Sequence, residues 1–269
     1  MKEKLMAQCH RFDPGGYAFL EGGFPYSQGV IAQAGYRIVR VRFAKAPTLA
    51  QGFARIASHL RAAKRPLTAL CAVELRSPAP FSFQGFHDFN VGYVAVLSDW
   101  GLVRAGRNPV ARSNVCPVYD APTEPVFHAF CYTVIGVSNV GASDNIGASN
   151  LPNSTNLDYV VAGSGEWPEG EPFPAAIVAR GDVSAAGLAA KAQFVLATMR
   201  ARCDGLGGDW SAVRAAQIYT AHDIHPLLAS HFASGGLITN GLTWQVCRPP
   251  IAELEFEMDL RSVASEWVL

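Results

Sequence analysis

The 269-residue sequence has little charge, and the charge it has is balanced. Charged residues make up 16% of the chain, and 22 Lys and Arg residues match 22 Asp and Glu residues, so the formal net charge is zero. This composition gives no electrostatic footprint for nucleic acid or for an anionic membrane surface. A surface with so few charges suggests that other subunits cover part of it.

Targeting and membrane-spanning segments are also missing. The opening run MKEKLMAQCHRF has no long apolar core, so we expect no secretory signal peptide. No apolar run approaches the length of a membrane-spanning helix. The six cysteines are scattered and form no C-x-x-C pair, which we interpret as free thiols in a reducing compartment. These absences together predict a soluble, cytoplasmic protein.

Common cofactor and nucleophile motifs are absent as well. The chain contains no Walker loop, dinucleotide fingerprint or G-x-S-x-G elbow. His222, His225 and His231 lie close in sequence, but they lack the i, i+4 spacing of a zinc helix, and Pro226 interrupts the segment. We therefore expect chemistry that needs neither a metal nor an organic cofactor.

The same order of predicted strands and helices occurs twice along the chain. Apolar periodicity predicts strands, helices and closing strands in the first half at 35–43, 49–64, 67–77, 83–101, 108–118 and 124–136. The same order recurs in the second half at 157–165, 185–203, 211–221, 225–234, 242–247 and 252–260.

This order predicts an α+β fold of two β-α-β-α-β-β domains, with helices on one face of each sheet. We place the domains at residues 1–137 and 156–269, joined by a linker rich in Ser, Asn and Gly at 138–155. The helix-free face of each sheet then has to be buried by association, and a three-fold assembly is one solution.

The last predicted strand, AELEFEMDL, carries the most unusual pattern. Glu253, Glu255, Glu257 and Asp259 alternate with apolar residues, and a period of two places all four acids on one face. The pattern alone favours a solvated acidic face, which also protects a sheet edge from aggregation. The alternative is that one acid lines a cleft as a general acid or base.

Three further features have both a structural and a functional interpretation. Arg112 falls among strand-like residues in NPVARSNV, so its guanidinium either reaches water or meets an anion. Ser164 and Gly165 end a strand as a simple turn, or as a turn whose backbone N–H groups hold an anion. His128 is either a core or interface histidine or a site residue.

Several segments resemble the Rid (YjgF/UK-type) family of imine and enamine deaminases. EGGFPYSQGV resembles that family's GPYSQAV opening, NPVARSNV its PARS strand, VVAGSGEWP its SGQIP turn, and AELEFEMDL its closing strand. FHDFNVGYVAVL resembles a family helix, and the resemblance covers essentially the whole chain as two tandem copies. It implies a chorismate-mutase-like α+β fold and a homotrimer with clefts between neighbouring domains.

The resemblance also implies roles for particular residues. Arg112 corresponds to the arginine that grips a substrate carboxylate, and Glu255, with Glu257 next in line, to the glutamate that handles water. Tyr26 and the Ser164–Gly165 turn correspond to substrate-binding positions. Neither copy holds a full set, so the resemblance predicts a composite site that draws on both halves.

The first functional hypothesis is a hydrolytic deaminase that releases ammonia from a small imino or enamino carboxylic acid. A ring-cleavage product of the 2-aminomuconate type, from aromatic degradation, fits this hypothesis. The second is a chorismatase-like hydrolase of an enolpyruvyl ether, because chorismatases have tandem Rid-like halves with one degenerate copy. The third is a metabolite-binding or scaffold protein, because each copy alone is incomplete.

Overall fold

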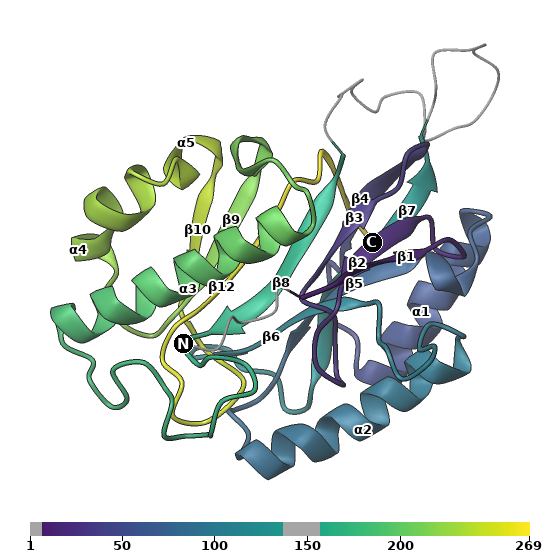
Figure 1. Cartoon of the computed structure of the whole chain (residues 1–269). Helices are drawn as coiled ribbons and strands as arrows, with labels where there is room; N and C mark the ends of the chain where they lie inside the picture. The colour runs from purple at the N-terminus through teal and green to yellow at the C-terminus, as the bar shows by residue number, and fades with distance from the viewer. Residues whose placement is uncertain (1–6, 137–156) are drawn as a thin grey trace.

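Two mixed sheets pack against each other, with helices on their outer sides (Figure 1). The structure is a computed structural model that describes residues 7–136 and 157–269, so the predicted linker at 138–155 lies outside the described residues. The strands are β1 (Cys9–Phe12), β2 (Tyr17–Leu20), β3 (Gly29–Ala32), β4 (Tyr36–Arg42), β5 (Leu70–Arg76), β6 (Ala111–Pro117), β7 (Val126–Ile135), β8 (Tyr159–Gly165), β9 (Ala215–Tyr219), β10 (Leu242–Gln245), β11 (Cys247–Arg248), β12 (Glu257–Arg261) and β13 (Ser265–Val268). The helices are α1 (Leu49–Ala62), α2 (Phe83–Asp99), α3 (Ala185–Gly205), α4 (His225–Leu227) and α5 (Leu237–Asn240), with a π-helix at Leu228–Ala233 and 3-10 turns at Leu67–Ala69 and Trp210–Ala212.

The two sheets share one strand order. The six-stranded sheet contains the order β6-β5-β7-β4, and the seven-stranded sheet contains β10-β9-β12-β8. In each, the first two strands are parallel and the other neighbours are antiparallel. This is the arrangement expected of two β-α-β-α-β-β units, and the predicted α+β class is confirmed.

Short strands cross from each half of the chain to the other. β1, β2 and β3 extend the seven-stranded sheet beside β8, although they precede the first predicted domain's sheet in sequence. β13 returns from the C-terminus to lie parallel to β4 in the six-stranded sheet. Both sheets therefore contain strands from both halves, and the domain boundaries drawn from the sequence remain a proposal.

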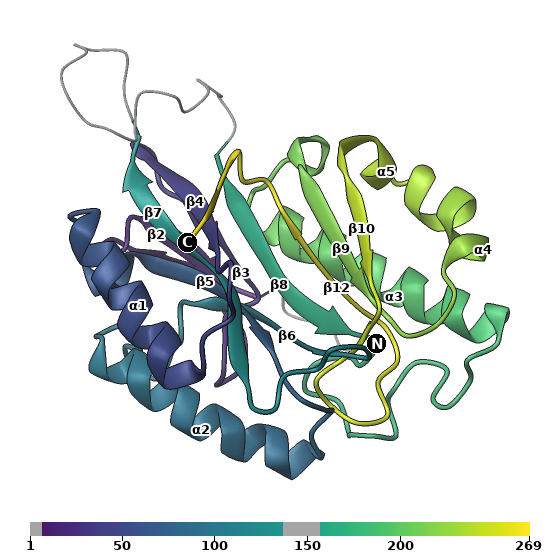
Figure 2. The same cartoon turned by 180° about the vertical axis from the view of Figure 1, so that it is seen from behind.

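Each long helix begins at a hydroxyl cap and packs an apolar stripe on its sheet. The Thr48, Ser82 and Ser184 side chains accept backbone N–H groups at the starts of α1, α2 and α3. From α3, Val195 and Met199 share a core with Met258 of β12. Figures 1 and 2 show α1 and α2 outside the six-stranded sheet and α3 outside the other.

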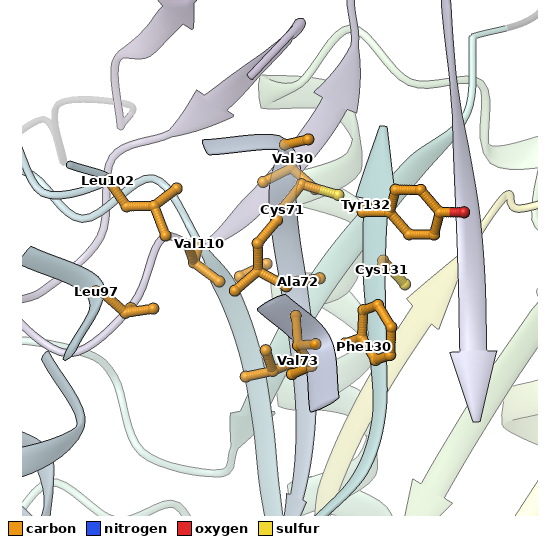
Figure 3. Close-up of a cluster of buried hydrophobic side chains, with 14 of the residues drawn as sticks. Val30, Cys71, Ala72, Val73, Leu97, Leu102, Val110, Phe130, Cys131 and Tyr132 are labelled. Atoms are coloured by element: carbon orange, nitrogen blue, oxygen red, sulfur yellow. The ribbon is translucent and has the colours of Figure 1, made fainter. Parts of the chain in front are cut away.

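A second hydrophobic core, beneath α1 and α2, contains side chains from both sheets. Val30 of β3, Val73 of β5, Leu97 of α2 and Phe130 of β7 belong to one buried cluster (Figure 3). A strand of the seven-stranded sheet thus packs into the core of the other half, which ties the two sheets together through apolar burial.

The helix-free faces of the two sheets meet, and polar groups are paired between them. Ser113 Oγ of β6 donates to Asp259 Oδ2 of β12 at 2.6 Å. The Arg76 guanidinium of β5 lies 5.6 Å from the centre of the Tyr219 ring of β9. The sequence led us to expect that other subunits bury these faces, whereas the second sheet of the same chain buries this part of them. The homotrimer remains a prediction.

The acidic closing strand begins later than predicted. β12 starts at Glu257, because the backbone N–H groups of Glu255 and Phe256 donate to the Glu166 carboxylate. Glu253 adopts a positive φ of 77° in the preceding turn and pairs at the surface with Arg180. Glu257 and Asp259 are each only 4% exposed, while Met258 and Leu260 face α3. The period of two is thus correct from 257 to 260, and the solvated acidic face is wrong for these two acids.

None of the helices in the described parts of the chain is long and apolar enough to cross a membrane.

Candidate active site

A cavity of about 410 Å³ lies where α2, β6, the end of β8 and the start of β12 come together. Its lining comes from both halves of the chain, as the composite-site hypothesis predicts. The polar and charged residues among its lining are Tyr26, His87, Asn90, Arg112, Asn114, Ser164, Glu169, Arg202 and Glu257.

Arg112 is the most unusual of these residues. It is 2% exposed, and neither Nη1 nor Nη2 has a hydrogen-bond partner among the described residues. Its guanidinium carbon lies 4.8 Å from the centre of the Tyr93 ring and 4.9 Å from that of Tyr26. Burial lowers the pKa of Arg112, and electrostatic interactions with Tyr93, Tyr26 and Glu257 offset part of this shift. A buried cation with free N–H donors is a ready site for an anion.

Neighbouring amides are also left without partners. Asn114 follows Arg112 by two residues, so both side chains lie on the same face of β6, and its Nδ2 is buried without a partner in the described part of the chain. The same holds for Asn90 Oδ1 on α2 and for Trp167 Nε1 after β8. Buried polar atoms are nearly always paired in folded proteins. A group of unpaired ones around one cavity is therefore available to bind a polar ligand.

Glu257 supplies an acid to the same cavity. Burial raises its pKa well above the ordinary value, the nearby Asp259 and Glu166 raise it further, and Arg112 and Arg202 lower it. Burial is the largest of these effects and favours the neutral form of the Glu257 carboxyl, which can donate a proton. Gly163 leaves room for this carboxyl, because a Cβ at that position would collide with Glu257 Oε1.

Tyr26, Ser164 and Gly165 line the same cavity, and their substrate-binding role remains a prediction. The Tyr26 ring faces Arg112, and burial raises the pKa of its hydroxyl to about 12. Gly165 pairs with Glu257 across the β8–β12 ladder, which brings the turn and the acid together. The turn and the acid thus come from the second half, and the arginine and tyrosine from the first.

Glu255 and His128 lie elsewhere. The Glu255 carboxylate contacts His222 Nε2 at 2.8 Å and Arg248 Nη1 at 3.7 Å, and Glu255 is not among the residues that line this cavity. His128 on β7 is also absent from that lining, and burial lowers its pKa to about 4. Of the two glutamates named from the sequence, the one that the structure brings to Arg112's cavity is Glu257.

Sequence reasoning missed Asn90, Asn114, Glu169 and Arg202. Asn114 carried a signal, since the period of two places it on the Arg112 face of the strand. Asn90 sits among apolar residues of a predicted helix, where a buried amide is uncommon. Glu169 in a loop and Arg202 near a helix end had no distinguishing pattern.

A search for metal sites gives no candidate within residues 7–136 and 157–269: no group of three or more His, Cys, Asp or Glu side chains is arranged to hold an ion.

Comparison with solved structures shows the fold. A chorismatase crystal structure aligns with a TM-score of 0.53 at 15% identity, covering 96% of this chain and 86% of that one. The YjgF gene product of E. coli aligns over 48% of this chain and 95% of its own at 15% identity, with a TM-score of 0.31. At such identity the chorismatase likeness concerns the fold and not the reaction.

Comparison at the sequence level shows the family. The sequence model of the 2-aminomuconate deaminase CnbZ family matches residues 9–267. The 2-amino-5-chloromuconate deaminase of Comamonas testosteroni is 42% identical over 259 residues, which cover 96% of this chain and 98% of that protein. The predictions of a Rid-like deaminase and of an enzyme are confirmed, and the chain belongs to the 2-aminomuconate deaminase family.

Proposed function

We propose that this chain hydrolyses the C–N bond of a 2-aminomuconate-type acid and releases ammonia. The observation that carries the proposal is Arg112, a buried arginine with both terminal nitrogens unpaired among the described residues, in one cavity with Glu257. The 42% identity to a 2-amino-5-chloromuconate deaminase supports this substrate type.

Arg112 holds the carboxylate next to the amino-bearing carbon. The planar fork of a guanidinium matches the two oxygens of a carboxylate, and the free Nη1 and Nη2 atoms can each donate to one of them. Asn114, on the same face of β6, offers its unpaired Nδ2 as a further donor. A charge-assisted hydrogen bond of this kind contributes about 1.5–3 kcal/mol.

Glu257 moves the protons. As a neutral acid it gives its proton to a carbon of the enamine, and the C=C–NH₂ group becomes an iminium ion. The carboxylate that remains takes a proton from water while the water oxygen attacks the iminium carbon. The C–N bond of the resulting carbinolamine breaks, its O–H proton leaves with the nitrogen, and the products are a ketone and ammonia. The overall reaction consumes the enamine and water and yields the ketone and ammonia, so no cofactor is needed for it to balance.

The test is ammonia release from freshly prepared 2-aminomuconate by the purified chain, compared with Arg112→Gln and Glu257→Gln variants. We expect steady release from the wild type, loss of turnover in Glu257→Gln and weakened substrate binding, seen as a raised KM, in Arg112→Gln. Chorismate serves as the second substrate, because hydrolysis of an enolpyruvyl ether is the alternative hypothesis drawn from the sequence. Release of pyruvate from chorismate without ammonia from 2-aminomuconate would replace this proposal with that alternative.

A further inference from the structure

A second arginine, Arg202, lines the same cavity as Arg112 and has no role in the reaction described so far. It comes from the end of α3, and its side chain is 7% exposed. Arg202 Nη1 donates to the backbone oxygens of Ala162 at 3.1 Å and Gly163 at 3.2 Å. These two bonds hold the guanidinium against β8, beside the glycine that makes room for Glu257.

The other N–H donors of the Arg202 guanidinium make only a long contact. Its Nη2 lies 3.5 Å from Glu169 Oε2, much longer than the 2.6 Å between Arg40 Nε and Glu74 Oε1 in the interior. An arginine has about five N–H donors, so these contacts leave part of the guanidinium free for a ligand.

Glu169 does not depend on Arg202 for its position. Its carboxylate accepts the backbone N–H of Gly23 at 3.2 Å and Gln28 Nε2 at 2.9 Å, and its side chain is 36% exposed. Glu169 and Arg202 also line a neighbouring cavity of about 480 Å³. A partly solvated carboxylate with two other donors can release an arginine at little cost.

The two arginines act on the same groups. Both influence the Tyr26 hydroxyl and the Glu257 carboxyl electrostatically, so both lie close to where a ligand in the cavity would sit. Arg112 carries a single positive charge, and burial of Glu257 in the same cavity favours the neutral form of that acid. One carboxylate of a ligand matches that charge, and a second carboxylate needs a second cation.

We propose that Arg202 binds the second carboxylate of a dicarboxylate substrate, and that Glu169 occupies Arg202 until that carboxylate arrives. This inference rests on the proposed function, in which Arg112 binds the carboxylate next to the amino group. Arg202 then selects dicarboxylates over monocarboxylates of the same length. Glu169 opposes binding, because its charge competes with the substrate for the same guanidinium.

The experiment compares two unreactive ligands by calorimetry. Muconate is a six-carbon diene with two carboxylates, and sorbate is the same diene with a methyl group in place of one of them. We expect the wild type to bind muconate roughly 10- to 100-fold more tightly than sorbate. Arg202→Gln removes this difference by weakening muconate alone, and Glu169→Gln tightens muconate alone. A purely structural role for the pair does not produce opposite signs.

Arg200→Gln is the matched control. Arg200 lies two residues earlier on α3, is exposed, and stacks 4.5 Å from the Trp210 ring centre, so its loss changes the same charge away from the cavity. We expect no change for either ligand. Equal weakening of muconate and sorbate by Arg202→Gln, or no weakening, would overturn the inference.

Failure of the proposed function gives a different result. A chain that releases no ammonia from 2-aminomuconate, yet loses its preference for muconate in Arg202→Gln, keeps the Arg202 assignment and loses the reaction. A chain that releases ammonia but discriminates equally well with and without Arg202 keeps the reaction and loses the assignment.

Discussion

β6 and β10 occupy matching places in the two sheets, yet their polar side chains differ in hydrogen bonding. Each strand runs parallel to its neighbour, β5 or β9. On β6, Arg112 and Asn114 keep buried N–H donors unpaired within the described residues. On β10, the Trp244 indole N–H donates to Thr220 O at 3.0 Å, while Gln245 donates to Gln217 and accepts from Arg76 at 3.0 Å.

The difference separates a ligand site from a partly exposed edge strand whose polar groups are paired. The polar groups of β10 satisfy one another, so they stabilise the fold and have little capacity left for a ligand. Those of β6 carry an uncompensated desolvation cost, which a bound carboxylate removes. The same contrast divides the two acids of β12: Asp259 accepts from Ser113, Tyr219 and Gln217, while Glu257 lines the cavity.

The largest expected effect comes from Glu257, the acid that lines the cavity with Arg112. Glu257→Gln should lower kcat by about 10²- to 10⁴-fold, because the amide cannot give and take the proton. The measurement is steady-state ammonia release. Glu255→Gln is the control, since the Glu255 carboxylate pairs with His222, and it should keep most of the activity. An equal loss in both variants would move the catalytic role towards Glu255.

Arg112 should act mainly on substrate binding. Arg112→Gln should raise KM by about 10- to 100-fold, and Arg112→Lys should not restore it, because an ammonium lacks the planar fork. Arg61→Gln, an exposed change at the end of α1, is the control and should leave kcat/KM unchanged. Full activity in Arg112→Lys would argue against a bidentate contact.

Gly163 tests the position of the acid without removing it. A Cβ at Gly163 collides with Glu257 Oε1, so Gly163→Ala should displace the carboxyl and lower kcat by about 10-fold or more. Gly92→Ala on α2 meets nothing within 4 Å and serves as the control. Normal kcat in Gly163→Ala would mean that the position of Glu257 is not critical.

Burial of Glu257 should cost stability at neutral pH. The native pKa lies above the unfolded value, so the native state keeps a proton that the unfolded chain releases, and stability falls as pH rises from the unfolded pKa towards the native one. Glu257→Gln lacks this term and should be about 1–3 kcal/mol more stable than the wild type at neutral pH. Denaturant unfolding at pH 4 and at neutral pH measures the difference, which should shrink in acid. A gap that stays the same at both pH values would contradict the buried-acid interpretation.

The paired polar groups of β10 give the smallest effect, and their loss should affect stability alone. Trp244→Phe removes the hydrogen bond to Thr220 O and should cost about 0.5–1.5 kcal/mol of unfolding free energy. Ammonia release should be unchanged. A drop in kcat comparable with that of Gly163→Ala would show that the β10 region also contributes to the reaction.

The sequence could locate the strands and the acids because their periodicity is long. Nine-residue alternation placed Glu257 and Asp259 on one face, and the structure agrees from residue 257 onward. The choice between Glu255 and Glu257 depended on where the strand begins, and β12 begins at Glu257 because the backbone N–H groups of Glu255 and Phe256 donate to the Glu166 carboxylate. The four-residue strands β1, β2, β3 and β13 were missed, since so short a run carries no period and pairs only through tertiary contacts.

By itself the sequence determined the α+β class, the two sets of elements and the resemblance that singled out Arg112 and Tyr26. These follow from local periodicity and from short runs of residues. Only the tertiary structure decided that the helix-free faces meet within one chain, that Glu257 shares a cavity with Arg112, and that Arg202 joins them. Such facts depend on which strands become neighbours in space, and burial among distant segments sets both the free donors of Arg112 and the raised pKa of Glu257.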